Sequence, residues 1–182
     1  CKMIQESIQK GMKMVPISFN LSKASFEDEP FMQEYMEVFQ QFDIPKEYIE
    51  FELLESISMD NSDKLIKVVD TIHKAGFRCA LDDFGSGYSS MSVLARVPID
   101  IIKLDRSLFQ NPYRDIDKFL IADGLLDILH HFPVQIVAEG VEDETVAEHM
   151  RQHGCDMIQG FYYYRPMPMD EFQRLIAEQG EC

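Results

Sequence analysis

Two adjacent aspartates, Asp82 and Asp83, directly follow the short apolar run Phe77–Leu81. Neighbouring carboxylates at the end of a buried strand repel each other and lose hydration unless a positive charge neutralises them. A divalent metal ion is the natural counter-charge, and the glycines of Phe84–Ser90 permit backbone angles typical of a shaped loop. The same residues also fit an aspartate-rich N-cap and turn before a short helix near Ser90–Ala95.

Other oxygen-bearing side chains recur near the ends of apolar runs. Asn20 ends one run, Glu52 lies near the end of the next, and Glu139 follows a later one. Amide and carboxylate oxygens are the ligands that Mg²⁺ or Mn²⁺ prefers, so Asn20, Glu52 and Asp82 predict a metal site, which Asp83 extends to a second ion. An acid beside such a site, here Glu139, is placed to act as a general base or as a further ligand.

Basic side chains near these acids have two interpretations. Lys103 lies in an apolar run, where its ammonium group either reaches the surface or faces the acids of neighbouring strands; charge compensation favours the second. His149 and His153 lie four residues apart on a predicted helix, a spacing that suits a metal ion. We expect that helix on the outside of the fold, with both histidines solvated.

Strand-like and helix-like segments alternate along the whole chain. Apolar runs predict six strands, at Val15–Leu21, Tyr48–Leu54, Phe77–Leu81, Ile99–Leu104, Val134–Ala138 and Asp156–Tyr162. Helical spacing of apolar residues predicts helices at Cys1–Lys10, Phe31–Phe39, Lys64–Ala75, Ser90–Ala95, Asp115–His130, Glu144–His153 and Met169–Ala177. Such alternation predicts a parallel sheet covered by helices. Because polar groups come from successive strand ends, a barrel with one shared mouth fits better than an open sheet.

A closed barrel of this type needs eight strands and about 250 residues, whereas this chain has 182 residues. We therefore expect one domain over residues 1–182, a TIM-like (β/α)8 barrel in which about six βα units are present and the N-terminal strands are missing. A longer parent protein or a partner would then cover the open sheet edges.

Composition excludes some classes of partner. The chain has 17 Lys and Arg against 32 Asp and Glu, a formal net charge of -15, which argues against binding polymeric nucleic acid or coating anionic membranes. The four scattered cysteines form no CxxC pair and suit a reducing cytosol. No apolar run is long enough to span a bilayer. We expect a cytoplasmic segment without direct membrane insertion, although the parent protein could be tethered to a membrane.

Six segments together resemble, in order and spacing, the EAL-domain family of bacterial cyclic-di-GMP phosphodiesterases. They are Asn20–Ser22, Glu52–Ser56, Asp82–Ser90, Ile101–Ser107, Ala138–Glu142 and Gln159–Phe161. The resemblance implies a barrel that hydrolyses one phosphodiester of cyclic di-GMP (c-di-GMP) to linear pGpG, with two Mg²⁺ or Mn²⁺ ions as cofactors. It also implies a homodimer formed through helices beside the aspartate loop.

The resemblance assigns roles to the candidate residues. Asn20, Glu52 and Asp82 match the ligands of one metal ion, and Asp82 and Asp83 match those of the second. Lys103 matches a lysine that steadies the attacking water or the charge forming at phosphorus. Glu139 matches the base or second-metal ligand.

Further matched positions surround that centre. Gln159, Glu142 and Asp105 are expected to bind substrate or to support the ligands, and Glu55 matches the glutamate that anchors the aspartate loop. The Glu-Ala-Leu motif that names the family, which supplies another metal ligand, is absent from this chain, and Leu54 stands where the family more often has threonine. We therefore expect an active parent protein but impaired activity of this chain alone.

Two alternatives stay open at this point. One is an inactive EAL-like module that binds c-di-GMP or a protein partner as a signalling receptor. The complete set of acids and the lysine favours catalysis over this alternative. The other is a barrel enzyme that acts on a different phosphoester.

Overall fold

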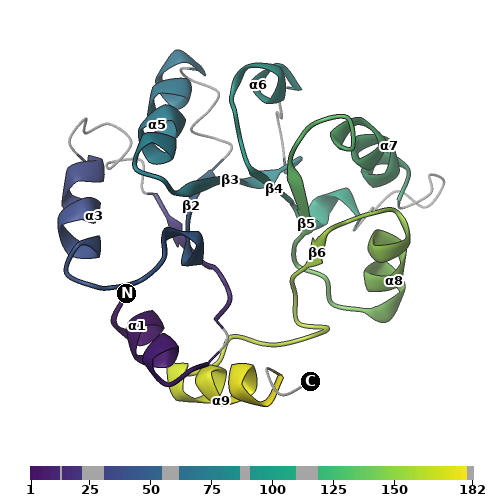
Figure 1. The fold of residues 1–182 in the computed structure, drawn as a ribbon. Coiled ribbons are helices and arrows are strands. Elements are labelled where there is room, and N and C mark those ends of the chain that lie inside the picture. Colours follow the sequence, from purple (N-terminus) through teal and green to yellow (C-terminus); the bar gives the residue numbers. More distant parts are fainter. Residues whose placement is uncertain (13, 22–30, 55–61, 87–90, 110–118, 180–182) are drawn as a thin grey trace.

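The computed structural model describes residues 1–12, 14–21, 31–54, 62–86, 91–109 and 119–179. Its centre is a six-stranded sheet in which the spatial order of the strands follows the sequence and every neighbouring pair is parallel. The strands are β1 Ile17–Asn20, β2 Ile49–Leu54, β3 Arg78–Phe84, β4 Ile101–Leu104, β5 Gln135–Ala138 and β6 Met157–Ile158. Figure 1 shows that the sheet curves as part of a barrel wall. The predicted partial barrel is thus confirmed.

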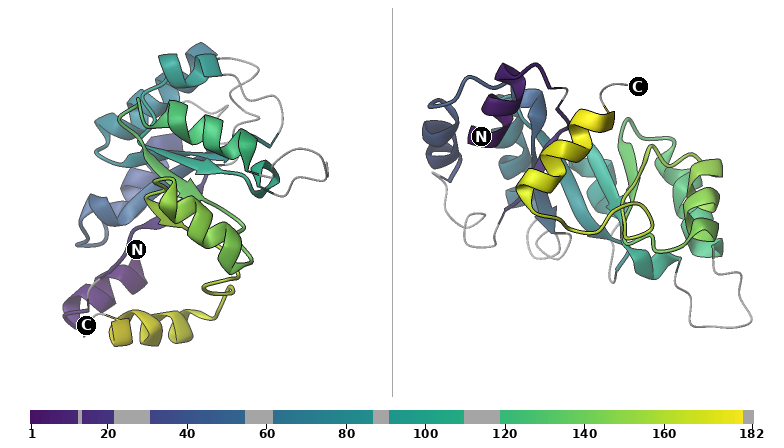
Figure 2. Two further views of the ribbon diagram at one scale, coloured as in Figure 1. Left: turned by 90° about the vertical axis from the view of Figure 1, so that its right-hand side faces the viewer. Right: turned by 90° about the horizontal axis from the view of Figure 1, so that it is seen from below.

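Helices between successive strands cover the convex side of the sheet, whereas the first and last helices lie across its open side (Figures 1 and 2). The helices are α1 Lys2–Gln9, α3 Phe31–Phe39, α5 Ser62–Lys74, α6 Met91–Arg96, α7 Leu120–Leu129, α8 Glu144–Gln152 and α9 Met169–Gln179, with short 3-10 turns at Lys46–Tyr48 and Arg106–Leu108. The first and last helices, α1 and α9, lie side by side, and Gln173 donates a hydrogen bond to Ser7 across 3.2 Å. Among the described residues, no helix has the length and hydrophobicity that crossing a bilayer requires.

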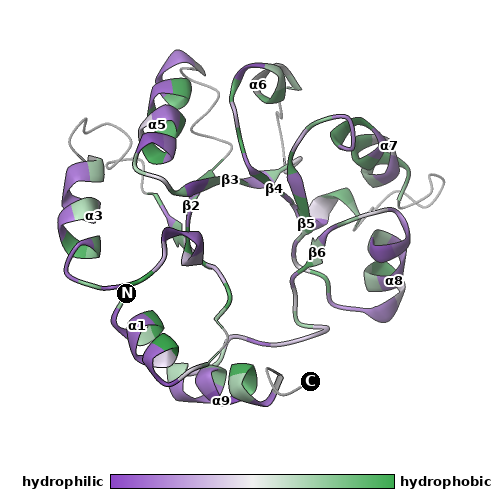
Figure 3. Ribbon diagram, viewed as in Figure 1, coloured by the Kyte–Doolittle hydropathy of each residue, from purple (hydrophilic) through white to green (hydrophobic). Residues whose placement is uncertain are grey.

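The amphipathic pattern of the helices explains how they attach to the sheet. In α5 the buried residues Leu65, Val68, Val69 and Ile72 recur at helical spacing, so one face packs inward and the other stays polar. Figure 3 shows hydrophobic and hydrophilic residues along both α5 and α8. Asp143 fixes the start of α8, because its carboxylate accepts a 2.9 Å hydrogen bond from the Val146 N–H.

Alternation along the strands gives the sheet two different faces. The outer face, under the helices, belongs to the main core and is apolar; it includes Phe51, Leu53, Cys79, Leu81, Ile102, Leu104 and Ile136. The inner face carries Ala80, Ile101 and Val137 as a small separate apolar cluster. Inward-facing charges lie before and after this cluster along the strands.

Toward the amino ends of the strands, Arg78 links three inward-facing side chains. Its guanidinium donates to Glu50 Oε1 across 2.9 Å and to Gln135 Oε1 across 2.8 Å. Ser18 donates to the other oxygen of Glu50 at 3.4 Å. Burial raises the pKa of Glu50, and the positive charge of Arg78 opposes this effect. This network lies on the amino-terminal side of the apolar cluster.

The last strand is much shorter than the predicted strand Asp156–Tyr162. β6 ends at Ile158, and the Tyr163 and Tyr164 N–H groups bond to the Gly160 carbonyl in a turn. Gly160 packs closely on the segment that follows β5, so a Cβ at position 160 would lie 2.0 Å from the Val141 carbonyl oxygen. The aromatic run that looks like a strand in sequence is therefore a turn.

Candidate active site

The Lys103 side chain lies on the inner face of β4 among three carboxylates, and the residue is only 7% exposed. Its Nζ atom is 2.5 Å from Glu139 Oε1, 2.6 Å from Glu52 Oε1 and 3.3 Å from Asp82 Oδ1. The acids come from the end of β5, from β2 and from β3. Four consecutive strands thus contribute to one charged group, which we call the Lys103 cluster.

Strand register explains why these residues meet. Parallel strands present their carboxyl ends at one edge, and side chains two residues apart share a face. Glu52 pairs with Ala80 in the ladder, so Asp82 projects from the same inner face one step further along β3. The Glu139 N–H bonds to the Leu104 carbonyl across 3.0 Å, which fixes the chain leaving β5 beside the end of β4.

The second aspartate reaches the same region because the end of β3 is irregular. The ladder between β3 and β4 shifts register between Leu81 and Phe84, and Asp83 has a φ of 58°, in the left-handed region. In a regular strand Asp82 and Asp83 would point to opposite faces. Here carboxylate oxygens of Asp82, Asp83 and Glu139 lie within 4.8 Å of one another.

This backbone conformation has local support. The Asp83 N–H donates to Asp82 Oδ1 across 3.1 Å. Gly85, two residues later, has a φ of 92°, and a Cβ there would lie 2.6 Å from Leu108 Cδ1. A left-handed residue other than glycine is uncommon and concentrates at functional sites. The turn therefore serves to bring two consecutive acids to one point.

Burial and charge shift the pKa values in the cluster. Burial raises the pKa of Glu139 to about 7, although its hydrogen bond with Lys103 acts in the opposite direction. Burial, followed by the charges of Asp82 and Asp105, raises the pKa of Asp83. Burial opposes the charged form of Lys103, but hydrogen bonds to Glu139 and Glu52 outweigh it and raise the pKa of the amine. Lys103 therefore stays protonated at neutral pH.

The donor set fits a divalent cation. Three carboxylates, on Glu52, Asp82 and Glu139, share the single ammonium group of Lys103, and that of Asp83 lies within 4.8 Å of two of them, so ionisation of all four leaves excess negative charge. A bound cation relieves this repulsion, and carboxylate oxygens are the ligands that Mg²⁺ or Mn²⁺ prefers. Asn20 is exposed and pairs with Glu52 in the ladder, which places its amide beside the same group.

Other predicted site residues lie around this cluster. Asp105 caps the 3-10 turn Arg106–Leu108, accepting a 3.0 Å hydrogen bond from the Ser107 N–H. Glu142 is exposed and forms a 3.4 Å ion pair with Arg106. Glu55 lies outside the described residues, and so do residues 87–90 of the loop that it is expected to anchor.

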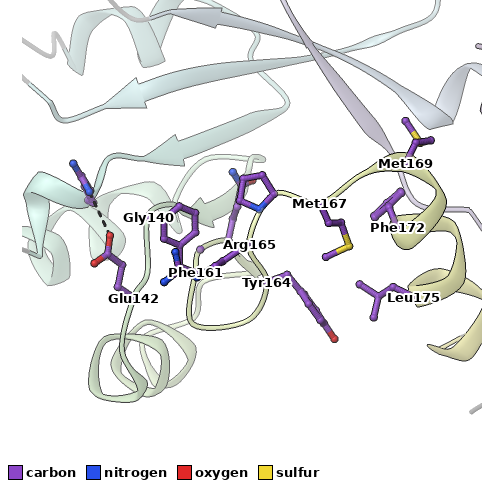
Figure 4. Close-up of a pocket in the computed structure, with 13 residues that line it drawn as sticks. Gly140, Glu142, Phe161, Tyr164, Arg165, Met167, Met169, Phe172 and Leu175 are labelled. Carbon is purple, nitrogen blue, oxygen red and sulfur yellow. Dashed lines mark hydrogen bonds and ion pairs between the residues drawn. The ribbon is translucent and has the colours of Figure 1, made fainter.

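Glu142 and Gln159 line a separate pocket of about 490 Å³ at the same edge of the sheet (Figure 4). Aromatic and apolar side chains dominate its wall, among them Phe161, Tyr164, Met167, Phe172 and Leu175. Two cations also contribute: Arg106, and Arg165, whose guanidinium lies 4.7 Å from the centre of the Phe161 ring. The aromatic wall of this pocket was not predicted, because Phe161 and Tyr162 fall within the predicted strand Asp156–Tyr162. The exposed aromatic run Phe161–Tyr164 was the available signal.

The fold and the cluster define a class, an α/β-barrel protein with an acidic, lysine-centred site at the carboxyl ends of its strands. The sequence model of the EAL domain matches residues 1–166. The chain therefore belongs to the EAL domain family, as its motifs predict.

Similar proteins agree with this assignment. The signaling protein YkoW of Bacillus subtilis is 30% identical over 179 residues, which cover 98% of this chain and 22% of that protein. The cyclic di-GMP phosphodiesterase PdeB of Shewanella oneidensis is 31% identical over 169 residues, covering 90% of this chain and 20% of that protein. The solved structure of the PaMucR phosphodiesterase in a c-di-GMP complex aligns with a TM-score of 0.86 at 28% identity, covering 94% of this chain and 70% of that one. The chain thus spans about a fifth of the length of these two curated relatives.

Proposed function

We propose that this chain forms part of the catalytic domain of a c-di-GMP phosphodiesterase, which cleaves one phosphodiester bond of the cyclic dinucleotide to give linear pGpG. The observation that carries the proposal is the Lys103 cluster, a buried ammonium group held by acids from neighbouring strands. Membership of the EAL domain family and relatives named as c-di-GMP phosphodiesterases support the substrate.

Two Mg²⁺ or Mn²⁺ ions are the cofactors that we propose. Asn20, Glu52 and Asp82 would hold one, and Asp82 with Asp83 would hold the other. When bound, such ions neutralise phosphate charge and activate water for attack on phosphorus. Without them the carboxylates of the Lys103 cluster would repel a phosphodiester, so the bound ions would allow a chain of net charge -15 to bind an anion.

The protein groups have separate tasks in this proposal. Lys103 stays positively charged and stabilises negative charge that develops near phosphorus. Glu139 has a pKa of about 7, which suits a group that accepts a proton from water at neutral pH. Asp105 supports the site indirectly by fixing the turn that carries Arg106.

The adjoining pocket is proposed to take one half of the dinucleotide. Its aromatic wall suits a flat base, and the guanidinium groups of Arg106 and Arg165 suit a phosphate. Gln159 and Glu142 line the same pocket with polar groups able to read a base edge.

The open sheet suggests that further strands complete the domain. Among the described residues, β1 and β6 end the strand order and do not pair with each other. We propose that two more strands of the parent protein fill this gap and bring the missing Glu-Ala-Leu motif to the site, and that the assembled domain acts in the cytoplasm as a homodimer.

The test is a hydrolysis assay on the protein that carries this chain, with c-di-GMP and Mn²⁺ and chromatographic separation of pGpG. We expect turnover that EDTA removes and that Lys103→Ala abolishes, while Lys67→Ala, which changes an exposed lysine of α5, keeps it. Binding of c-di-GMP without turnover would favour a receptor instead. Faster cleavage of other phosphodiesters would exclude the proposed substrate.

A further inference from the structure

A second cluster of metal-ligating side chains lies on the outside of the sheet, where α7 and α8 are neighbours (Figure 1). Asp123 comes from α7, His149 comes from α8, and His153 is the C-cap residue directly after α8. One ligand atom of each lies within 4.8 Å of those of the other two. None of the three contributes to the Lys103 cluster or to the pocket beside it.

The His149 ring is held in one orientation. Its Nε2 atom lies 2.7 Å from Asp123 Oδ1. The ring stacks on Phe119 at a centroid distance of 3.6 Å and on His153 at 4.0 Å. The side chain is therefore only 20% exposed, whereas the sequence analysis expected both histidines to be solvated.

His153 is exposed, but a local contact selects the tautomer of its neutral ring. Its Nδ1 atom lies 2.8 Å from the His149 carbonyl oxygen. A carbonyl oxygen only accepts hydrogen bonds, so Nδ1 carries the hydrogen and the neutral ring keeps a lone pair on Nε2. A hydrogen bond on one ring nitrogen is the usual way in which a metal-binding histidine is oriented.

We propose that Asp123, His149 and His153 form a binding site for Zn²⁺ that joins α7 to α8. Two imidazoles and one carboxylate, with a water in the fourth position, are a ligand set that zinc accepts. Mg²⁺ prefers oxygen ligands, so this site and the Lys103 cluster select different ions. When Nε2 of a neutral His149 ring binds Zn²⁺, the hydrogen that it shared with Asp123 leaves and Nδ1 takes one from solvent, so the ring stays neutral and no net proton is released.

Binding requires one of the two imidazoles to turn, because the His149 and His153 rings stack with an interplanar angle of 16° and each nitrogen binds a metal ion in the plane of its own ring. In a tetrahedral zinc site with bonds of about 2.0–2.2 Å, neighbouring ligand atoms lie roughly 3.3 Å apart. The His149–Asp123 contact of 2.7 Å therefore opens by roughly half an ångström. Wider pairs, up to 4.8 Å apart, close when the exposed His153 ring turns out of its stack on His149.

The experiment is a ZnCl₂ titration of the 182-residue chain by calorimetry and thermal unfolding, with millimolar Mg²⁺ present to occupy the oxygen-rich site. Saturating Zn²⁺ should raise the Tm by roughly 5–10 °C. His153→Ala removes an exposed ligand without opening the core, and should weaken zinc binding at least tenfold. Asp123→Asn, which keeps the shape of the side chain, should weaken it as well.

His131→Ala is the matched control, because His131 is exposed and lies outside the cluster; its zinc affinity should equal that of the unchanged chain. Equal zinc affinity of the unchanged chain and His153→Ala would overturn the proposal. Loss of zinc binding in Glu52→Gln but not in His153→Ala would also overturn it, since the zinc would then be bound at the Lys103 cluster.

Discussion

Glu139 Oε1 lies 2.5 Å from Lys103 Nζ, and this ion pair joins the end of β5 to the inner face of β4. Glu52 and Asp82 approach the same ammonium group from β2 and β3, on the opposite side of β4. One cation therefore holds together acids from three other strands. Because three acids contact this one cation, removing the lysine should increase the repulsion within the cluster, and removing an acid should decrease it.

Lys103→Ala should abolish turnover in the protein that carries this chain. The change leaves acids in the cluster without their shared counter-charge, which costs roughly 3–5 kcal/mol for a buried pair. We expect a lower Tm without metal ions, partly restored by Mn²⁺, and no detectable pGpG in the hydrolysis assay. Activity within about threefold of the unchanged enzyme would remove Lys103 from the proposed chemistry.

Glu52→Gln removes the charge of this side chain but keeps nearly the same shape. Glutamine has nearly the same size as glutamate, and its amide oxygen accepts a hydrogen bond as the Glu52 carboxylate does from Lys103. We expect turnover to fall at least about a hundredfold with little change in Tm. Glu34→Gln, on an exposed position of α3, is the control. Equal turnover of both variants would contradict a role for the Glu52 charge.

Asp83→Asn should weaken Mn²⁺ binding and leave the fold intact. Asparagine tolerates the left-handed backbone that Asp83 adopts, and the change removes a carboxylate whose pKa burial and neighbouring acids raise. We expect at least tenfold weaker Mn²⁺ binding by calorimetry and an unchanged or higher Tm in EDTA. Asp83→Ala, by contrast, should lower that Tm. Unchanged Mn²⁺ affinity in Asp83→Asn would exclude Asp83 as a ligand.

Glu139 should make stability depend on pH in the absence of metal ions. Its folded pKa of about 7 exceeds the ordinary value of 4.5, so between these values the folded chain binds more protons than the unfolded chain. Stability therefore falls as pH rises through this window. Glu139→Gln should be more stable than the unchanged chain at pH 8, by on the order of 2 kcal/mol after solvent screening. The advantage should vanish near pH 4; denaturant unfolding in EDTA measures both, and a constant difference would contradict the assignment.

Gly160→Ala and Gly124→Ala should have opposite effects. A Cβ at position 160 would lie 2.0 Å from the Val141 carbonyl oxygen, whereas one at position 124 meets nothing within 4 Å. The first change should cost at least about 2 kcal/mol and distort the aromatic pocket. The second lies inside α7 and should stabilise by about 0.5–1 kcal/mol. Chemical denaturation of both variants measures the contrast; a stable Gly160→Ala would show that the turn adapts.

The fold could be predicted from the sequence because the signals of strands and helices are local and repeated. Apolar runs that alternate with helical spacing predict six βα units, and all six strands are present. The main error was β6, where an aromatic run suggested a long strand. The close approach of Gly160 to Val141 determines the conformation of that segment. A contact between two separate segments is not visible in the local periodicity of the sequence.

For the site, the sequence predicted which residues take part but not every contact between them. Strand-end acids and Lys103 could be identified from residue type, since charges in apolar strands need partners. That Asp83 points to the same place as Asp82 could not be predicted, because it depends on a bulge and on one left-handed residue. Asp123 could not be connected with His149 either, because that pairing depends on how α7 and α8 lie beside each other.

Ala80, Ile101 and Val137 lie between the Arg78 network and the Lys103 cluster. These apolar side chains separate the two charged groups along the strands, but the charges of Glu52 and Lys103 still act on the pKa of Glu50. A substitution that changes the charge of Glu50 or Arg78 should therefore also be felt, over a distance, by the acids and the lysine at the mouth of the barrel.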